Sequence, residues 1–209
     1  PMNTALSPRK SPRQSRSAVT VTAILDATAR ILVERGYAAT STNAVAERAG
    51  VSVGSLYQYF PNKDALIAAL HARHADQMKA VIERALARAM DVNLVDGLTG
   101  LIEASVEAHR VDADLHRVLE QQLAGLDVVD AHDQFDEIVQ DRIVALLTRH
   151  RDSLAVTDLR LAAYMLMHSV HALIHTIVAT RPRGVSLKTA TAEIVRMTRV
   201  YLTAPVPAA

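Results

Sequence analysis

The sequence predicts an all-α protein in which a three-helix head joins a helical body through a long fourth helix, with about nine helices in all. Hydrophobic residues make up 50% of the 209 residues, while aromatic residues make up only 3%. Ala, Leu, Arg and Val dominate, which favours helices over sheets. Apolar residues also recur at a helical period through most of the chain.

The stretch at 42–60, TNAVAERAGVSVGSLYQYF, predicts two short helices joined by a tight turn. Ala46 is small enough for a second helix to cross closely, and Gly50 supplies the positive φ that the turn needs. Leu56 would fill the space between the two helices. This spacing is typical of a DNA-binding helix-turn-helix, although an ordinary αα-hairpin with a glycine turn has the same pattern.

The composition limits the setting in which the chain works. Cysteine is absent, so neither a disulfide framework nor a thiolate metal site is possible. No apolar run approaches the roughly 20 residues of a membrane span, and the N-terminus lacks the apolar core of a signal peptide. We therefore expect a soluble, cytoplasmic protein with no membrane partner.

Basic residues are concentrated at the N-terminal end. Residues 1–63 contain eight Lys or Arg against three acidic residues, whereas the remainder contains 15 basic and 19 acidic residues. This asymmetry suggests a polyanionic partner. We expect residues 1–17 to form a disordered arm, in which residues such as Arg13 and Arg16 follow a phosphate backbone or enter a minor groove.

The helix that follows the turn has an unusual outer surface. It is expected to start at Ser52 and to stop before Pro61, with Leu56 and Phe60 facing inward. The outward positions are then Val53, Gly54, Tyr57 and Gln58, with Tyr59 at the edge. Glycine permits close approach to a groove, tyrosine hydroxyls reach phosphates, and glutamine can pair with adenine.

Residues 18–70 resemble the N-terminal domain of the tetracycline-repressor (TetR) family of bacterial transcriptional regulators. Over 20 residues match in order without a gap. They are Gly36-Tyr37, Thr40-Ser41, Val45-Ala46, Ala49-Gly50-Val51-Ser52, Gly54-Ser55-Leu56-Tyr57, Tyr59-Phe60 and Asn62-Lys63-Asp64-Ala65-Leu66.

This resemblance implies a DNA-binding head, a ligand-binding body and a homodimer. It implies that DNA is contacted by Thr42, Ser52, Tyr57, Gln58, Tyr59 and Lys63. Val53 stands where many members carry a polar or basic residue, so direct base readout is expected to be limited. We divide the chain into a basic arm (1–17), a helix-turn-helix domain (18–64), a ligand-binding and dimerisation domain (65–204) and a loose tail (205–209).

The helices of the body are predicted from the helical period of its apolar residues. It predicts helices at 18–35, 63–90, 93–109, 113–126, 130–150, 157–180 and 187–202, in addition to the two of the turn. The polar residues Ser105, His109, Gln122 and Arg142 fall on the apolar stripes of their helices.

Buried polar groups need partners, so we predict that these residues converge on a small-molecule pocket. The predicted ligand contacts are Ser105, His109, Leu119, Gln122, Arg142, Met165, His168 and His171. Internal pairing is the alternative for each polar residue, for example Arg142 with Glu103 or Glu120.

The helix at 157–180 is apolar nearly all round, so it is expected to be buried on most sides. His168, His171 and His175 share one side with Tyr164. Histidines at this spacing could bind a transition metal, although carboxylates are scarce on the helix. They could equally line the pocket or pack within the core or an interface.

The leading hypothesis is a ligand-responsive transcriptional regulator, and most directly a repressor. It would bind a palindromic DNA operator as a homodimer through helices 157–180 and 187–202, and an unidentified small-molecule effector would release it. No cofactor is expected. A metal-responsive regulator is the main alternative. An all-helical enzyme is less favoured, because no Ser/His/Asp spacing, phosphate loop or H-E-x-x-H pattern occurs.

Overall fold

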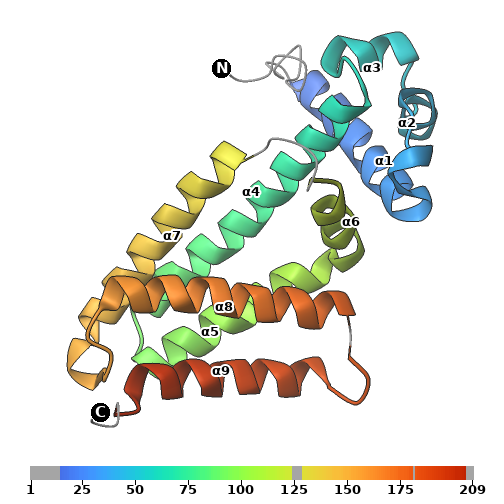
Figure 1. Ribbon diagram of the computed structural model, residues 1–209. Coiled ribbons are helices and arrows are strands. Elements are labelled where there is room, and N and C mark those ends of the chain that lie inside the picture. The colour runs from blue at the N-terminus through green and yellow to red at the C-terminus, as the bar shows by residue number, and fades with distance from the viewer. Residues whose placement is uncertain (1–14, 124–128, 181, 206–209) are drawn as a thin grey trace. The chain divides into compact units, whose positions relative to one another are not determined.

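The computed structural model describes residues 15–123, 129–180 and 182–205 (Figure 1). Over these residues the chain forms α-helices, one short 3-10 helix and no strand, which confirms the all-α prediction. The helices are α1 (Ser15–Ala39), α2 (Thr42–Ala49), α3 (Val53–Tyr59), α4 (Lys63–Ala89), α5 (Leu94–Val111), α6 (Ala113–Leu123), α7 (Val129–Arg149), α8 (Leu159–Thr180) and α9 (Leu187–Thr203), with the 3-10 helix at Arg151–Ser153.

The helices form two compact units. The first unit contains the described residues up to Asp76 together with α6 from Asp114 onward, and the second contains the remaining helices and the rest of α4. The sequence predicts a boundary after residue 64, but the structure places the division within α4, between Asp76 and Gln77. The difference arises because the first turns of α4, and α6 with them, contribute side chains to the core of the first unit.

The core of the first unit is formed by α1, α2, α3, α4 and α6. Its side chains come from positions one helical turn apart, so each helix contributes one apolar face. The fully buried members include Ile24, Ile31, Leu32, Val45, Ala46, Leu56, Phe60, Leu66, Ile67, Leu70 and Leu119. This core fixes which sides of α2 and α3 remain at the surface.

The turn between α2 and α3 has the geometry that the sequence predicts. Gly50 has φ 68° and ψ 29°, in the left-handed region, and its N–H bonds to the carbonyls of Ala46 and Glu47. The hydroxyl of Ser41 caps the start of α2, and that of Ser52 caps the start of α3. α1 is likewise interrupted at Gly36, where φ is 74°.

The second unit is organised around α8, which packs against α5, α7 and α9. Its buried residues are Ala162, Ala163, Leu166, Ile174 and Val178, all on one side of the helix. The expectation that α8 is buried on most sides is therefore wrong for the single chain. Leu161 is 55% exposed, and Tyr164 and Met165 are each 49% exposed, because the neighbouring helices cover only the opposite side.

α8 also revises the expectation about membrane spans. Among the described helices it is the one long and apolar enough to cross a membrane by length and composition, with 22 residues and a mean hydropathy of 1.4 in its most apolar window. Its buried residues belong to the hydrophobic clusters of the second unit. These contacts are those of a core helix with one uncovered side.

Replacing Gly50 with alanine should destabilise the first unit. A residue with a side chain in the left-handed region costs about 1 kcal/mol or more, although no atom lies within 4 Å of the position that a Cβ would take. Gly100 is the matched control, since it is helical, exposed and equally unobstructed. Gly100→Ala should stabilise α5 by about 0.5–1 kcal/mol. Urea denaturation measures the change in the free energy of unfolding for both variants. Equal changes of the same sign would contradict the left-handed conformation of Gly50.

Candidate nucleic-acid interface and ligand-binding body

The surface of α3 has the predicted orientation. Leu56 and Phe60 are buried at 0% and 1% exposure, whereas Val53 and Tyr57 are 38% and 41% exposed. Gly54 and Gln58 are exposed beside them, and Tyr59 is half-buried at the edge of the core. The short helix therefore presents a glycine, a valine, a tyrosine and an amide to solvent.

Hydroxyl groups from α2 and α3 are held together at this surface. The side-chain oxygens of Thr42 and Tyr57 lie 3.1 Å apart, so the hydroxyl of Tyr57 is fixed relative to the start of α2. Ser52 accepts from the backbone N–H of Ser55 at 3.1 Å, and the two serine hydroxyls lie 2.8 Å apart. These hydroxyls retain lone pairs or protons with which to meet phosphate oxygens.

A second group of contacts joins the end of α1 to the start of α4. The hydroxyl of Tyr37 donates to a carboxylate oxygen of Asp64. Lys63 donates to the carbonyl of Tyr37 at 3.2 Å, and its ammonium lies 3.8 Å from the centre of the Tyr37 ring. Lys63 is therefore partly occupied inside the head, although an ammonium has two further N–H donors to offer.

The bond to Asp64, together with burial, raises the pKa of the Tyr37 hydroxyl above its ordinary value. A second polar contact, between α1 and α2, is made by Arg48, which donates to both carboxylate oxygens of Glu34 at 2.5 and 2.7 Å. This contact lowers the pKa of the Glu34 carboxyl.

Arg13 and the side chain of Arg16 lie outside the described residues, so their proposed role stays a prediction.

In the second unit, three of the predicted ligand contacts come together. Ser105 is half-buried and donates to the carbonyl of Leu101 at 2.8 Å. His109 is 3% exposed, and its Nδ1 lies 2.7 Å from the carbonyl of Ser105. Since a carbonyl only accepts, this nitrogen carries the proton. The ring of His109 lies 5.4 Å from that of His171 on α8.

Other predicted ligand contacts lie elsewhere. Leu119 is 1% exposed and belongs to the core of the first unit. Arg142 is exposed, so its expected place on the buried stripe of α7 is wrong. The buried face of α7 is formed by Val139, Ile143, Leu146 and Leu147, and Arg142 lies about 85° from its middle. The side chain of Gln122 lies outside the described residues.

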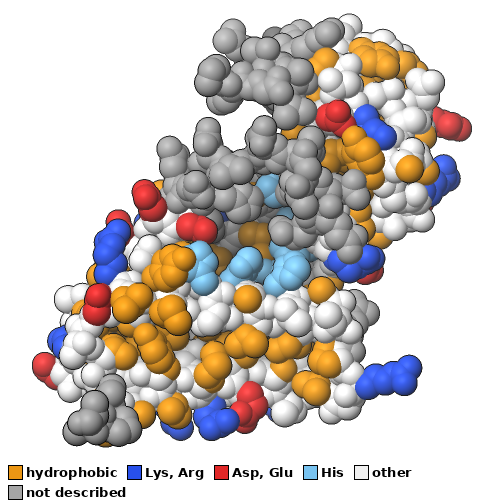
Figure 2. Space-filling view, viewed as in Figure 1, with side chains coloured by type: hydrophobic (Ala, Val, Ile, Leu, Met, Phe, Trp, Pro, Cys, Tyr) orange, Lys and Arg blue, Asp and Glu red, His pale blue; other side chains and the backbone are white. Residues whose placement is uncertain are grey.

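The histidines of α8 form a row along one edge of the helix, and Figure 2 shows histidine side chains side by side there. The rings of Tyr164 and His168 meet edge to face at 4.3 Å, and those of His171 and His175 are 6.3 Å apart. Within the described part of the chain, no group of three or more His, Asp or Glu residues is placed to hold a metal ion. The metal hypothesis therefore has no geometric support there.

A groove of about 460 Å³ runs between α5 and α9. Its lining is mainly apolar, with four charged side chains among its residues. The residues are Thr99, Glu103, Val106, Glu107, Arg110, Leu187, Lys188, Thr191, Ala192 and Val195. None of the predicted ligand contacts lines this groove, so it gives no support to the predicted pocket.

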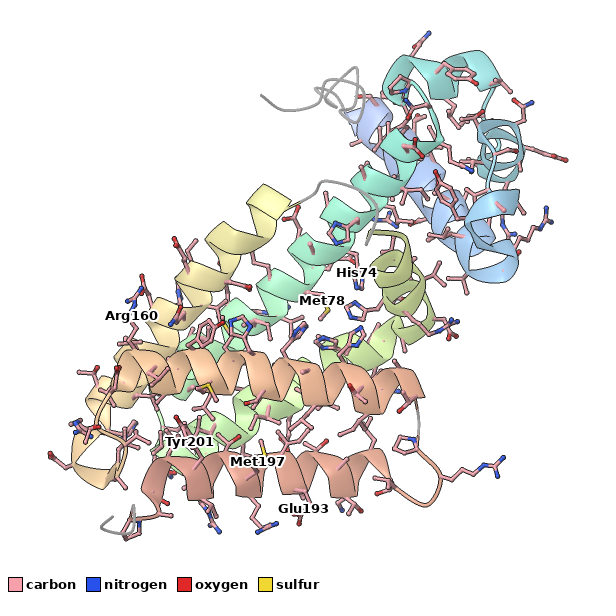
Figure 3. The ribbon with its side chains drawn as sticks, in the orientation of Figure 1. His74, Met78, Arg160, Glu193, Met197 and Tyr201 are labelled. Carbon is pink, nitrogen blue, oxygen red and sulfur yellow. The ribbon has the colours of Figure 1, made fainter. Side chains whose placement is uncertain are left out.

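Exposed apolar side chains gather over α8 and α9, as Figure 2 shows. We name this surface the α8–α9 face. Its larger members are Leu161, Tyr164, Met165, Leu173, Met197, Val200 and Tyr201, each between 37% and 55% exposed. Figure 3 labels Met197 and Tyr201 on α9. A contiguous apolar surface of this kind marks an interaction site on a soluble protein.

The contacts that were not predicted from the sequence include the Tyr37–Asp64 hydrogen bond, the Arg48–Glu34 ion pair and a hydrogen bond between His74 and His116 inside the first unit. Tyr37 was identified only as a family match. Nothing in the local sequence pairs two histidines that lie 42 residues apart.

These features define a class of protein: a helix-turn-helix regulator with an exposed second helix and a separate helical unit. A family model for "Bacterial regulatory proteins, tetR family" matches residues 24–70, and one for "Tetracyclin repressor-like, C-terminal domain" matches residues 93–202. The chain belongs to the TetR family, whose members are soluble DNA-binding proteins, and the resemblance noted from the sequence is confirmed.

Curated relatives match over less than half of the chain. The HTH-type transcriptional repressor KstR of Mycolicibacterium smegmatis is 47% identical over 62 residues, which is 30% of each chain. The HTH-type transcriptional activator FasR of the same organism is 32% identical over 106 residues, 48% of each chain. The chain thus spans less than half the length of these relatives.

Solved structures match over nearly the whole chain. NalD, described as the secondary repressor of the MexAB-OprM multidrug efflux pump in Pseudomonas aeruginosa, has a TM-score of 0.70 and 21% identity. The match covers 91% of this chain and 99% of that one. A tetR-family regulatory protein from Rhodococcus RHA1 has a TM-score of 0.68 and 18% identity, over 88% and 97% of the two chains. At 18% and 21% identity, these matches show that the chains share a fold.

Replacing Tyr37 with phenylalanine should cost about 1 kcal/mol of stability at pH 7, because the hydrogen bond to Asp64 is lost. Because the pKa of Tyr37 is raised in the folded protein, the contribution of its hydroxyl to the free energy of unfolding depends on pH. This contribution is complete below the ordinary tyrosine pKa of about 10, and it is lost as the pH rises through the higher pKa of the folded state. The gap between wild type and Tyr37→Phe should therefore close in alkali.

Urea denaturation at pH 7 and at pH 11 measures this gap. Tyr164→Phe is the control, because Tyr164 is exposed on α8 in the other unit. If the difference in stability between wild type and Tyr37→Phe is the same at pH 11 as at pH 7, the protonated Tyr37 hydroxyl does not stabilise the protein through its hydrogen bond to Asp64.

Proposed function

We propose that this protein is a ligand-responsive transcriptional regulator that binds a palindromic operator as a homodimer and is released by a small molecule. The observation that carries the proposal is the outer surface of α3, where Tyr57 and Gln58 lie exposed on a helix held by a left-handed turn. Repression is favoured, because KstR and NalD are named repressors. FasR is named an activator, so the position of the operator relative to the promoter decides between repression and activation.

The DNA contacts follow from the geometry of the head. α3 enters the major groove with Gly54 against the groove wall, and Gln58 reads an adenine edge. The hydroxyls of Thr42, Tyr57 and Ser52 meet phosphates, with Tyr59 and Lys63 at the margin. Val53 makes only apolar contact, so much of the electrostatic affinity comes from the arm, including Arg13 and Arg16.

The α8–α9 face is the proposed dimer interface. An obligate dimer needs a large apolar surface, and this face collects the exposed aromatic and aliphatic side chains of two adjacent helices. Isologous pairing would set two α3 helices in successive major grooves about 34–36 Å apart or somewhat more. The same pairing would cover the side of α8 that the single chain leaves open.

The effector site is proposed beside α5 and α8, where Ser105, His109 and His171 meet, with His168 and Met165 farther along α8. The imidazole of His109 is buried, the hydroxyl of Ser105 is half-buried, and His171 and His168 are exposed beside apolar residues of α8. Polar groups of this kind beside apolar side chains suit an apolar molecule with a few polar atoms. Ligand and DNA would then bind antagonistically, each weakening the other by the same factor. A cytoplasmic regulator without catalytic activity fits this scheme, and the matched relatives are named as regulators.

Operator binding tests the proposal directly. Purified protein should bind the DNA upstream of its own coding sequence with a steep salt dependence, measured by fluorescence anisotropy. Deleting residues 1–14 should lower the slope of log K against log salt by up to about three, because Arg9, Lys10 and Arg13 are removed. Gln58→Ala should instead lower the affinity for the operator by about tenfold and leave the affinity for nonspecific DNA unchanged. Binding without salt dependence or sequence preference would contradict the proposal.

The dimer is tested by placing a charge in the α8–α9 face. Met197→Glu should raise the dissociation constant of the dimer at least about tenfold, because a carboxylate would be buried without a partner. Val92→Glu is the matched control, since Val92 is 43% exposed against 39% for Met197 and lies outside this face. Sedimentation analysis gives the oligomeric state. Equal effects of the two substitutions would place the interface elsewhere.

A further inference from the structure

Val53 lies on the side of α3 that meets DNA in the proposed function. It is the first residue of the helix and is 38% exposed. Tyr57, one turn later on the same side, is 41% exposed, whereas Leu56 is buried in the core of the first unit. When α3 enters a major groove, Val53 therefore enters with its first turn, and this is the part of a recognition helix that contacts base edges.

The start of α3 holds Val53 in a defined position. The hydroxyl of Ser52 accepts the backbone N–H of Ser55 at 3.1 Å, and the backbone N–H of Leu56 bonds to the carbonyl of Ser52 at 3.0 Å. A valine in a helix also strongly prefers one χ1 rotamer. The two methyl groups of Val53 can therefore meet a groove with little loss of side-chain freedom.

The residue after Val53 leaves room for DNA to come close. Gly54 is exposed on the same surface. Beyond its own helix backbone and its chain neighbours, a Cβ built on Gly54 would meet only the hydroxyl of Ser52, at 4.0 Å. Because glycine has no side chain, the methyl groups of Val53 project beyond the backbone beside them.

A single base presents an apolar group in the major groove. Guanine offers the acceptors N7 and O6, cytosine the N4 donor, and adenine N7 and N6, whereas thymine adds a C5-methyl group to its O4 acceptor. A valine cannot bond to the polar edges, and covering them removes their water without replacing its hydrogen bonds. Against thymine, the valine buries apolar surface on both sides of the contact. A valine at this position therefore favours thymine.

We propose that Val53 is a specificity-determining residue that reads the C5-methyl group of a thymine in each half-site of the operator. The proposal rests on the proposed binding of the operator by α3. Gln58 lies five residues later, which is about 7.5 Å along the helix axis, or about two base-pair steps of 3.4 Å. The two side chains therefore read different base pairs of one half-site, Val53 a thymine and Gln58 an adenine.

Uracil in place of thymine tests this contact, because uracil lacks the C5-methyl group and keeps the same pairing edge. The upstream DNA is prepared with thymine or with uracil throughout, and the affinity of the protein for each is measured by fluorescence anisotropy. Wild type should bind the uracil DNA about fourfold more weakly for each half-site, the factor for one buried methyl group. For a dimer on two half-sites the loss is about 16-fold.

Variants assign the contact to Val53. Val53→Ser replaces the two methyl groups with one hydroxyl and should lower the ratio of thymine to uracil affinity below about fourfold. Val33→Ser is the matched control, since Val33 is 39% exposed on α1, and it should keep the wild-type ratio. Gln58→Ala should weaken the binding of both DNAs and leave their ratio unchanged, because Gln58 reads a different base pair.

The outcomes separate this contact from the proposed function. Absence of salt-dependent, sequence-selective binding to the thymine DNA would overturn the regulator itself. Selective binding with equal affinities for thymine and uracil DNA would overturn the Val53 contact alone. The same thymine-to-uracil ratio in wild type and Val53→Ser would also overturn it, since the methyl group would then act through DNA shape or through another residue.

A measurement on the wild-type protein decides the matter if Val53→Ser does not fold. Single replacements of thymine with uracil identify the sensitive thymine of a half-site. Exchanging its base pair for cytosine–guanine should weaken binding. Placing 5-methylcytosine there should then recover about fourfold per half-site, because it restores the methyl group. Without that recovery, the contact between Val53 and the methyl group is ruled out.

Discussion

Asp64 sets the geometry on which the head depends. It accepts the Tyr37 hydroxyl while the neighbouring Lys63 donates to the Tyr37 carbonyl and covers its ring. These contacts tie the chain before α2 to the first turn of α4. Because α2 and α3 are the segment between these two anchors, closing this loop limits the directions that α3 can take. The apolar core around Leu56 and Phe60 then fixes which side of α3 faces solvent, while these polar contacts hold the two ends of the segment together.

The head could be predicted from sequence almost residue by residue, because its determinants are local. A positive φ requires Gly50, serine hydroxyls at 41 and 52 mark helix starts, and the spacing of Leu56 and Phe60 defines the buried side. The family match covers the same residues. Helix boundaries in the body were also predicted within a few positions, since apolar periodicity is a local property.

Partners between helices could not be predicted in the same way. A helical wheel shows which side of a helix is apolar, but it does not show which element covers that side. Leu119 was therefore assigned to a ligand site although it packs with the head, and Arg142 was placed on the buried stripe of α7 although its side chain is exposed. α8 was expected to be buried because its composition is that of a covered helix. The neighbouring helices cover only one side of α8, so Leu161, Tyr164 and Met165 stay exposed.

The continuity of α4 has a consequence for the two cores. Its 27 residues rise about 40 Å, and they include neither glycine nor proline, the usual causes of a kink. Leu66, Ile67 and Leu70 lie in the core of the first unit, whereas Leu86 lies in a core cluster of the second. One unbroken helix therefore supplies apolar side chains to both cores, so a residue that interrupts α4 would weaken the packing of each of them.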